Sequence, residues 1–221
     1  MNVAFIPVRG GSKSIPLKNI KEIAGHPLVY YTAKAANDCV DIDVVYVATD
    51  SDIIKETVEG LGLSKVEVIG RSEENASDTA STESAMLEFA EKYDFDNICL
   101  IQATSPLLTH EDLEGGFKKF KEADSVLSVV RQKRFVWEEN ADGSVSPVNY
   151  DVFNRPRRQE FDGFLVENGA FYITSKKLLL ESKNRVSGKI AAYEMSDYTY
   201  FEIDEPSDFK ISEIRLLQND K

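Results

Sequence analysis

Short apolar runs alternate with segments of helical periodicity through the first part of the chain. Runs typical of buried strands occupy residues 2–8, 43–49, 66–69, 97–102 and 125–130. Apolar positions spaced three or four residues apart predict helices, one beginning at Pro27 and the others over residues 51–62, 81–93 and 109–123. Because strands and helices alternate, we expect an α/β fold, with a doubly wound, mostly parallel sheet that carries helices on both faces.

The hydrophobic pattern changes after residue 130. Residues 131–167 are polar, aromatic and poorly periodic, and they include the only tryptophan, Trp137. Regular patterns then return, with strands expected at residues 171–174, 189–195 and 198–203 and helices at residues 175–181 and 206–218. We interpret residues 1–221 as a single domain that contains a lobe inserted within residues 131–197.

The charge balance and the lengths of the apolar runs exclude two classes of partner. The chain carries 38 acidic and 26 basic residues, a net charge of −12, whereas nucleic-acid surfaces need broad cationic patches. No apolar run approaches the roughly 18 residues that span a bilayer. We therefore expect neither a nucleic acid nor a membrane as partner. Cys39 and Cys99 lie in apolar surroundings without zinc or disulfide spacing, which indicates buried thiols in a reducing, cytoplasmic compartment.

A local cluster of cations follows the first apolar run. It places Arg9, Lys13 and Lys18 around the pair Gly10-Gly11, and no acidic residue precedes position 22. Glycines let backbone N–H groups approach an oxyanion, and cations balance its charge, so this loop suits a phosphate group. A solvated turn whose lysines balance nearby acids is the alternative. The spacing matches neither a Walker loop nor the dinucleotide fingerprint.

Residues 6–19, Ile-Pro-Val-Arg-Gly-Gly-Ser-Lys-Ser-Ile-Pro-Leu-Lys-Asn, resemble the opening motif of the acylneuraminate cytidylyltransferases, the CMP-sialic acid synthetases. Further motifs of that family follow in order at Arg71 and at residues 76–82, 100–107, 157–159, 167–173 and 202–209. Because the resemblance covers almost the whole chain and includes several ordered motifs, it is specific. It implies a Rossmann-like fold of the nucleotidyltransferase type, in which the inserted lobe serves dimerisation, and hence a homodimer.

The resemblance also implies a reaction. CMP would pass from CTP to the anomeric hydroxyl of a nonulosonic acid, with release of pyrophosphate and with Mg²⁺ as cofactor. Arg9 and Lys13 are implied as the catalytic residues, which neutralise charge on the phosphates. The residues implied to hold the substrate nucleotide are Gly10, Gly11, Ser12, Lys18, Asn19, Arg71 and Thr82. For Thr82, a helix cap beside Ser81 is the alternative role.

Four residues are implied on the side of the acceptor sugar, namely Gln102, Arg158, Asn168 and Tyr172. Gln102 ends an expected core strand, and polar residues at the carboxyl ends of strands face the ligand cleft in open α/β sheets. A satisfied core amide is the alternative for this glutamine. An arginine fork suits the sugar carboxylate, and the neighbouring Arg157 is either a surface charge or a second such partner.

Glu202 and Asp204 are the candidate metal ligands. They lie two positions apart where the expected strand over residues 198–203 ends, so in an extended chain both side chains would point to one face. Two carboxylates on one face suit Mg²⁺, which takes few protein ligands and keeps waters and phosphate oxygens. The family usually has two aspartates here, so the glutamate is a departure from its pattern. Acids that decorate the N-terminus of the following helix are the alternative.

The identity of the acceptor stays open at this point. The family often brings bulky aromatic residues to the acyl group of the sugar, whereas the corresponding stretch here, residues 184–188, has none. Legionaminic or pseudaminic acid is therefore an alternative acceptor. Another is 3-deoxy-manno-octulosonate, although its enzymes carry an aspartate where this chain has Thr104. A non-catalytic nucleotide-binding protein of the same fold is the alternative from another class.

Overall fold

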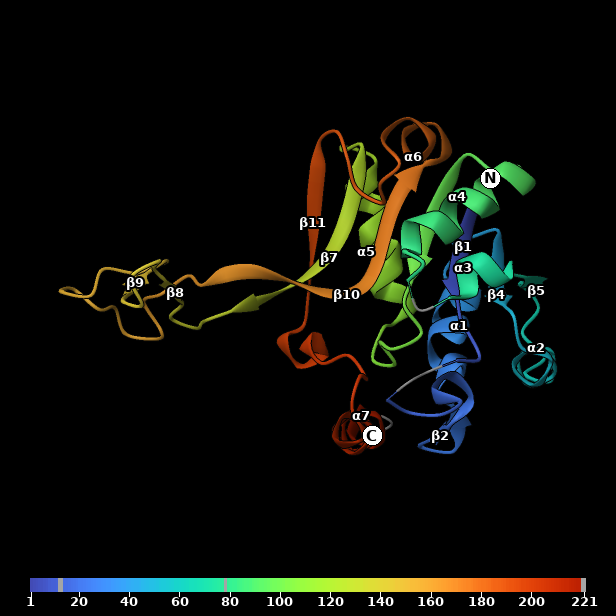
Figure 1. Cartoon of the computed structure of the whole chain (residues 1–221), viewed down its shortest axis with the longest axis horizontal. Coiled ribbons are helices and arrows are strands. Elements are labelled where there is room, and N and C mark those ends of the chain that lie inside the picture. The colour runs from blue at the N-terminus through green and yellow to red at the C-terminus, as the bar shows by residue number, and fades with distance from the viewer. Residues whose placement is uncertain (12–13, 78, 220–221) are drawn as a thin grey trace.

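A seven-stranded sheet forms the centre of the computed structural model, which describes residues 1–11, 14–77 and 79–219 (Figure 1). Its strand order is β11-β7-β10-β6-β1-β4-β5. The strands are β1 (Asn2–Pro7), β4 (Val44–Thr49), β5 (Val66–Gly70), β6 (Asn97–Ile101), β7 (Ser125–Gln132), β10 (Phe164–Ser175) and β11 (Ile190–Met195). All neighbouring strands pair in parallel except β10, which runs antiparallel to both β6 and β7. The mostly parallel sheet predicted from the alternating runs is thus confirmed.

Helices cover both faces of this sheet, as predicted. Alternate residues of β1 enter two different cores, Ala4 and Ile6 on one face and Val3 and Phe5 on the other. The helices are α1 (Leu28–Asp38), α2 (Asp52–Glu59), α3 (Glu73–Ala76), α4 (Thr82–Lys92), α5 (His110–Phe120), α6 (Lys176–Ser182) and α7 (Pro206–Asn219). Buried residues of α1, α2 and α5 belong to the first core and those of α4 and α6 to the second, except that Leu28 of α1 lies in a third, smaller cluster. None of the described helices has the length and hydropathy that crossing a membrane requires.

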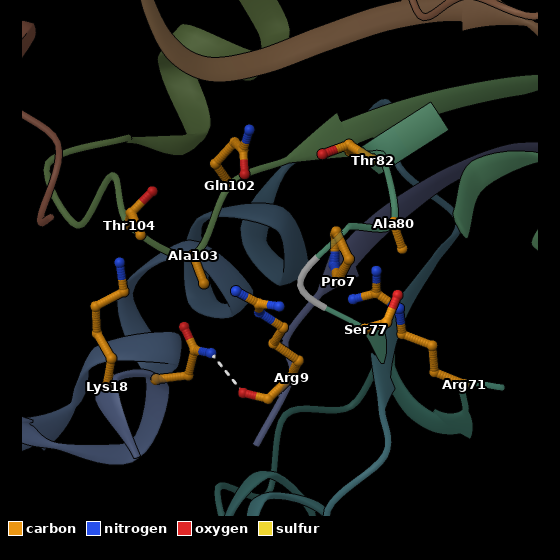
Figure 2. Close-up of a pocket in the computed structure, with 11 residues that line it drawn as sticks. Pro7, Arg9, Lys18, Arg71, Ser77, Ala80, Thr82, Gln102, Ala103 and Thr104 are labelled. Atoms are coloured by element: carbon orange, nitrogen blue, oxygen red, sulfur yellow. Dashed lines mark hydrogen bonds between the residues drawn. The ribbon is translucent and has the colours of Figure 1, made fainter. Parts of the chain in front are cut away.

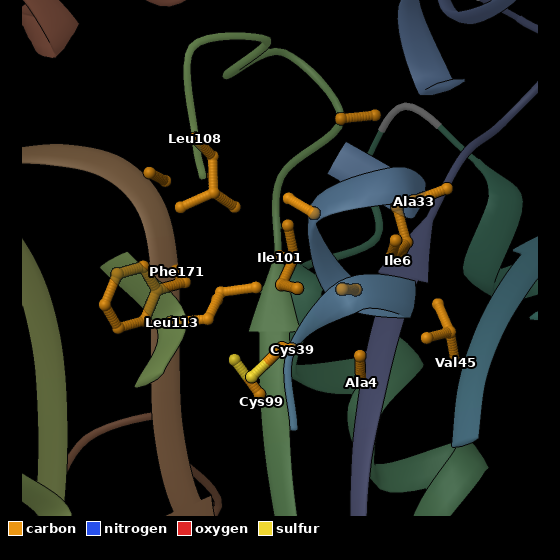
Figure 3. Packing of buried hydrophobic residues seen from close by; sticks show 14 of the residues in the cluster. Ala4, Ile6, Ala33, Cys39, Val45, Cys99, Ile101, Leu108, Leu113 and Phe171 are labelled. Atoms are coloured by element: carbon orange, nitrogen blue, oxygen red, sulfur yellow. The ribbon is translucent and has the colours of Figure 1, made fainter. Parts of the chain in front are cut away.

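The first core shows why the sheet and its helices pack closely. Ala33 of α1 and Leu113 of α5 lie against the side chains of β1 and β6, where Ile6 and Ile101 are fully buried (Figure 3). The free thiol of Cys99 is also buried in this cluster, and desolvation raises its pKa well above the usual range. The expectation of buried thiols is therefore confirmed for both cysteines.

The segment predicted to be irregular after residue 130 projects away from the sheet (Figure 1). Strands β7 and β10 continue together beyond the sheet, with Phe164 paired to Gln132. They carry a small antiparallel sheet of β8 (Trp137–Glu139) and β9 (Val145–Pro147). Apolar side chains on this lobe are exposed to solvent, most fully that of Phe153. That the lobe serves dimerisation stays a prediction.

The prediction of a strand over residues 198–203 is wrong. Residues Asp197–Tyr200 form a short 3-10 helix, η2, and residues 201–205 are irregular. The hydroxyl of Thr199 and its N–H both donate to the carbonyl of Ser196, which closes a local turn in place of a sheet ladder. The remaining elements are also short, namely η1 (Lys18–Ile20) and a hairpin of β2 (Glu22–Ile23) and β3 (His26–Pro27). Helix α1 follows this hairpin and begins at Leu28, one residue after the predicted start at Pro27.

Candidate active site

A pocket of about 250 Å³ opens at the carboxyl ends of the central strands (Figure 2). Residues just after β1, β5 and β6 line it, which is where open α/β sheets bind ligands. The lining residues are Pro7, Arg9, Lys18, Asn19, Arg71, Ser77, Ala80, Thr82, Gln102, Ala103 and Thr104. Six of these were predicted from the sequence. Ser77 and Ala80 were not, although they belong to the motif at residues 76–82, because uncharged side chains gave no chemical signal of their own.

Three cationic side chains are arranged around the pocket, with Gln102 and Thr82 opposite them (Figure 2). Arg9 follows β1, Lys18 opens η1 and Arg71 follows β5. Desolvation lowers the pKa of Arg71, but an arginine remains charged at neutral pH. This concentration of positive charge in a chain of net charge −12 supports the prediction of an anionic ligand.

Two of the predicted nucleotide residues also organise the loops that carry them. Asn19 is buried, and its amide Nδ2 donates to the carbonyl of Arg9 over 3.3 Å. The ammonium of Lys18 donates to the carbonyl of Ile203 over 2.8 Å and lies 3.4 Å from Oδ1 of Asp204. These bonds join the loop after β1 to η1 and to the segment before α7.

The glycine pair was predicted to bind a phosphate through its backbone N–H groups, which stays a prediction. The N–H of Gly10 donates to Oδ1 of Asp50 over 2.9 Å, so in this structure it binds a carboxylate of the chain itself. Neither Gly10 nor Gly11 is among the described residues that line the pocket. A Cβ on Gly10 would lie 3.0 Å from the Cβ of Ser51, which explains the need for glycine at this close approach. Ser12 and Lys13, predicted for the same loop, lie outside the described residues.

The alternatives for Thr82 and Gln102 are decided by the geometry. Ser81 caps helix α4, because its hydroxyl accepts the N–H of Ser84 over 3.0 Å, whereas Thr82 begins the helix and lines the pocket. Gln102 also lines the pocket, while its backbone N–H donates to the carbonyl of Ala170 over 3.1 Å. A helix cap for Thr82 and a core amide for Gln102 are both wrong.

The other three acceptor-side residues lie outside this pocket. Arg158 is exposed on the lobe and lines a different groove, of about 1000 Å³, between the base of the lobe and η2. Asn168 is buried and donates to Sδ of Met195 and Oγ1 of Thr199, both at 3.2 Å. Tyr172 is also buried in the sheet, and its hydroxyl donates to Oε2 of Glu167 over 2.8 Å. Arg157 lies exposed beside Arg158.

The two candidate metal ligands lie beside the pocket but not on a strand. The half-buried Glu202 accepts a long hydrogen bond of 3.4 Å from the hydroxyl of Thr104, which lines the pocket. Burial, first of all, and the charge of Asp204 raise the pKa of Glu202. Two neighbouring carboxylates whose charges disfavour each other form a donor set that a divalent cation stabilises, and Mg²⁺ needs only one or two of them. The residues therefore fit the predicted cofactor.

The alternative role of these acids, at the N-terminus of the following helix, is filled by Asp208. Asp208 accepts the N–H groups of Asp204 and Glu205 through Oδ2, over 3.0 and 2.7 Å. It thus binds the backbone at the start of α7, which leaves the side chains of Glu202 and Asp204 for other roles. In the ranges that the structure describes, no cluster of three or more potential metal ligands is found, so substrate oxygens would complete the coordination.

Comparisons with known proteins place the chain among cytidylyltransferases. A family model described as Cytidylyltransferase matches residues 3–220. An N-acylneuraminate cytidylyltransferase of Oncorhynchus mykiss is 41% identical over 97% of this chain and 50% of its own length. One from Streptococcus agalactiae serotype III (strain NEM316) is 27% identical over 94% of this chain and 51% of its own. The chain thus spans about half the length of the curated relatives it matches.

A solved structure shows the same fold. It is that of a CMP:2-keto-3-deoxy-manno-octonic acid synthetase complexed with CTP. The similarity covers 99% of both chains with a TM-score of 0.74 at 19% identity. At this low identity the likeness bears on the architecture alone, and it confirms the Rossmann-like nucleotidyltransferase type.

Proposed function

This chain belongs to the cytidylyltransferase family, and we propose that it transfers CMP from CTP to the anomeric hydroxyl of a sialic-type nonulosonic acid. The observation that carries the proposal is the ring of Arg9, Lys18 and Arg71 around a pocket that Gln102 completes from a third strand. A triphosphate needs such a concentration of cations, and a hydroxylated acceptor needs a polar side chain beside it.

In the proposed reaction, the sugar hydroxyl attacks the α-phosphorus of CTP and the bond to the β-phosphate oxygen breaks, which releases pyrophosphate. The residues supply little covalent chemistry, because positioning and charge stabilisation dominate phosphoryl transfer. Arg9, with Lys13 from the same loop, stabilises charge on the phosphates. Lys18 is held in place by the carbonyl of Ile203, and Arg71 and Thr82 contact the nucleotide from the opposite side.

Mg²⁺ is the proposed cofactor, and Asp204 and Glu202 would hold it. When bound, it would neutralise charge on the triphosphate. Thr104 orients Glu202 through its hydroxyl, and Asp208 fixes the backbone of Asp204. The exposed Asp204 side chain is also within reach of Lys18, so the metal corner and the cationic pocket share a boundary.

We also propose a homodimer in which the lobe of one copy completes the site of the other. Arg158 is the support: it lies between β9 and β10, outside the pocket of its own chain. An Arg158 side chain from a second copy would bind the carboxylate of the acceptor through two donors. Asn168 acts indirectly, because it holds Met195 and Thr199 at the sheet edge that leads to η2. A cytoplasmic location is proposed from the free thiols of Cys39 and Cys99.

One observation favours a second candidate for the acceptor. The stretch over residues 184–188 carries Arg185 where an apolar acyl pocket would call for aromatic residues. Legionaminic or pseudaminic acid, whose substituents differ from those of N-acetylneuraminic acid, is therefore the second candidate.

Pyrophosphate release tests the proposed function. The protein is incubated with CTP, Mg²⁺ and one acceptor at a time, chosen from N-acetylneuraminic, legionaminic and pseudaminic acids and 3-deoxy-manno-octulosonate. We expect release with at least one nonulosonic acid and none without acceptor. A protein that binds CTP but releases no pyrophosphate with any acceptor would be a nucleotide-binding protein of the same fold.

A further inference from the structure

Arg185, which was not predicted as a site residue, connects two elements that lie beside the pocket, α4 and β10. It lies in the loop between α6 and β11, and its Nε donates to Oε1 of Glu83 on α4. Its guanidinium also lies over the ring of Tyr172 on β10, 5.0 Å from the ring centroid. The hydroxyl of Tyr172 donates in turn to Oε2 of Glu167. A single side chain thus contacts one helix and one strand through different interactions.

The surroundings of this cluster make these contacts strong. The side chains of Arg185 and Glu83 are only 23% and 20% exposed, and Tyr172 is 5% exposed. Water therefore screens the ion pair less than it screens a surface pair. The negative charges of Glu167 and Glu202 both act on Tyr172, and Arg185 is the cation that opposes them.

Both ends of the cluster lead directly to the pocket. Glu83 lies in the first turn of α4, next to Thr82, which lines the pocket. Tyr172 pairs with Leu100 on β6, two residues before the pocket residue Gln102. A shift of α4 relative to β10 would therefore change the distance between Thr82 and Gln102, and a guanidinium that touches both elements resists such a shift.

We infer that Arg185 is a positioning residue, which fixes the start of α4 against β10 and thereby sets the separation of the nucleotide-side and acceptor-side walls. The inference rests on the proposed function. The shape of the guanidinium matters as well as its charge, because it donates to a carboxylate through Nε while it lies over an aromatic ring. Lysine at this position retains the charge but not both geometries.

Four variants test the inference: Arg185→Leu, Arg185→Lys, the reversed pair Glu83→Arg with Arg185→Glu, and the control Lys176→Leu. Lys176 is a matched control because it also pairs with a carboxylate, that of Asp94, and lies 5.1 Å from the centroid of an aromatic ring, that of Phe95. It lies at the end of the sheet opposite the pocket, where its backbone N–H donates to the carbonyl of Asp96. The readouts are the dissociation constant for CTP by calorimetry, kcat and KM for the acceptor, and the thermal midpoint.

We expect Arg185→Leu to lower kcat/KM for the acceptor and to weaken CTP binding, each by about 10-fold, because charge-assisted contacts are lost on both walls. Lys176→Leu should also lower the thermal midpoint, but it should leave both constants within about twofold of the wild type. Arg185→Lys should recover part of the loss, because it keeps a cation beside Glu167 and Glu202. The reversed pair should not, because it places a further carboxylate beside Tyr172.

Two results would overturn the inference. One is an Arg185→Leu variant whose CTP affinity and acceptor kinetics match the wild type. The other is a loss that equals that of Lys176→Leu, which would make Arg185 a residue of general stability. If the wild type binds CTP but turns over no acceptor, the proposed transfer fails while the CTP affinities of the variants still decide the role of Arg185. Absence of CTP binding by the folded wild type would overturn both.

Discussion

Replacing Gly169 with alanine tests how the fold makes room for the carboxylate of Glu202. Gly169 lies in the bulge of β10 with a φ of +68°. A Cβ built there would lie 1.9 Å from Oε1 of Glu202 and 2.7 Å from its Cδ. Glu202 cannot keep its place beside Thr104 under such contacts, so the substitution acts on the candidate metal corner from a neighbouring strand.

A second glycine isolates the part of this cost that comes from the backbone. Gly62 has a φ of +67°, and a Cβ built on it meets nothing within 4 Å. Gly62→Ala should therefore lower the free energy of unfolding only by the cost of a left-handed backbone at alanine, roughly 1–2 kcal/mol. Gly169→Ala should lose the same amount and, in addition, about 1–3 kcal/mol for displacing the Glu202 side chain.

Urea unfolding measures the difference in free energy of unfolding between the two variants. An unchanged slope m of that free energy against urea concentration checks that unfolding stays two-state. A third comparison adds Glu202→Ala: in that background the extra cost of Gly169→Ala should disappear, because the clashing side chain is gone. Gly169→Ala should also raise the Mg²⁺ concentration for half-maximal pyrophosphate release, whereas Gly62→Ala should not. Equal losses of stability in the two glycine variants, or no coupling to Glu202, would refute this reasoning.

Three further predictions follow from the site and its surroundings. Lys13→Ala should lower turnover by roughly 10²–10³-fold, as loss of a transition-state charge contact does, and unchanged turnover would remove its catalytic role. If the lobe acts across a dimer, mixing inactive Arg71→Ala and Arg158→Ala chains should restore about a quarter of wild-type activity, since half the dimers gain one intact site; no recovery would place Arg158 in its own chain's site. Burial raises the pKa of Glu88, but hydrogen bonds led by that from Lys92 lower it from 4.5 to about 2. Glu88 therefore contributes stability above pH 4.5 that is lost as the pH falls toward 2. Glu88→Gln should flatten the fall in urea midpoint over this range, and a slope equal to that of the wild type would contradict the assignment.

Much of the fold followed from local patterns. Apolar runs of five or six residues predicted the central strands β1, β4 and β6, because a strand buried on both faces consists almost entirely of apolar residues. The cations after β1 and the polar residue after β6 indicated the pocket, since strand ends converge at one edge of a parallel sheet. The motif resemblance added Arg71 and Thr82, which chemical pattern alone did not select.

What the sequence did not predict depends on contacts between distant segments. Residues 198–203 have strand-like composition, but the turn closed by Thr199, and the donation from Arg215 to the carbonyl of Tyr198, hold them outside the sheet. Asn168 was expected to face the acceptor, whereas Met195 and Thr199 bind its amide in the interior. Apart from this local turn, the partners lie 17 to 31 residues away along the chain, beyond the range of any periodicity.

Two site features were missed for the same reason. The bond between Gly10 and Asp50 joins segments 40 residues apart, and the pair of Arg185 and Glu83 joins segments 102 residues apart. A glycine loop beside cations indicates phosphate binding, but the sequence gives no sign that a carboxylate of the chain binds one of its N–H groups. Arg185 appeared in the sequence only as a departure from an aromatic pattern, and its role emerges when the fold brings it to Glu83 of α4 and Tyr172 of β10.

Calorimetric titration of CTP into the protein in the presence of Mg²⁺ shows directly whether the cationic pocket binds the nucleotide. We expect saturable binding at one site per chain, with a dissociation constant below about 1 mM, and a loss of at least about 10-fold in affinity in Arg71→Ala. Absence of saturable heat from wild-type protein that circular dichroism shows to be folded would contradict this expectation.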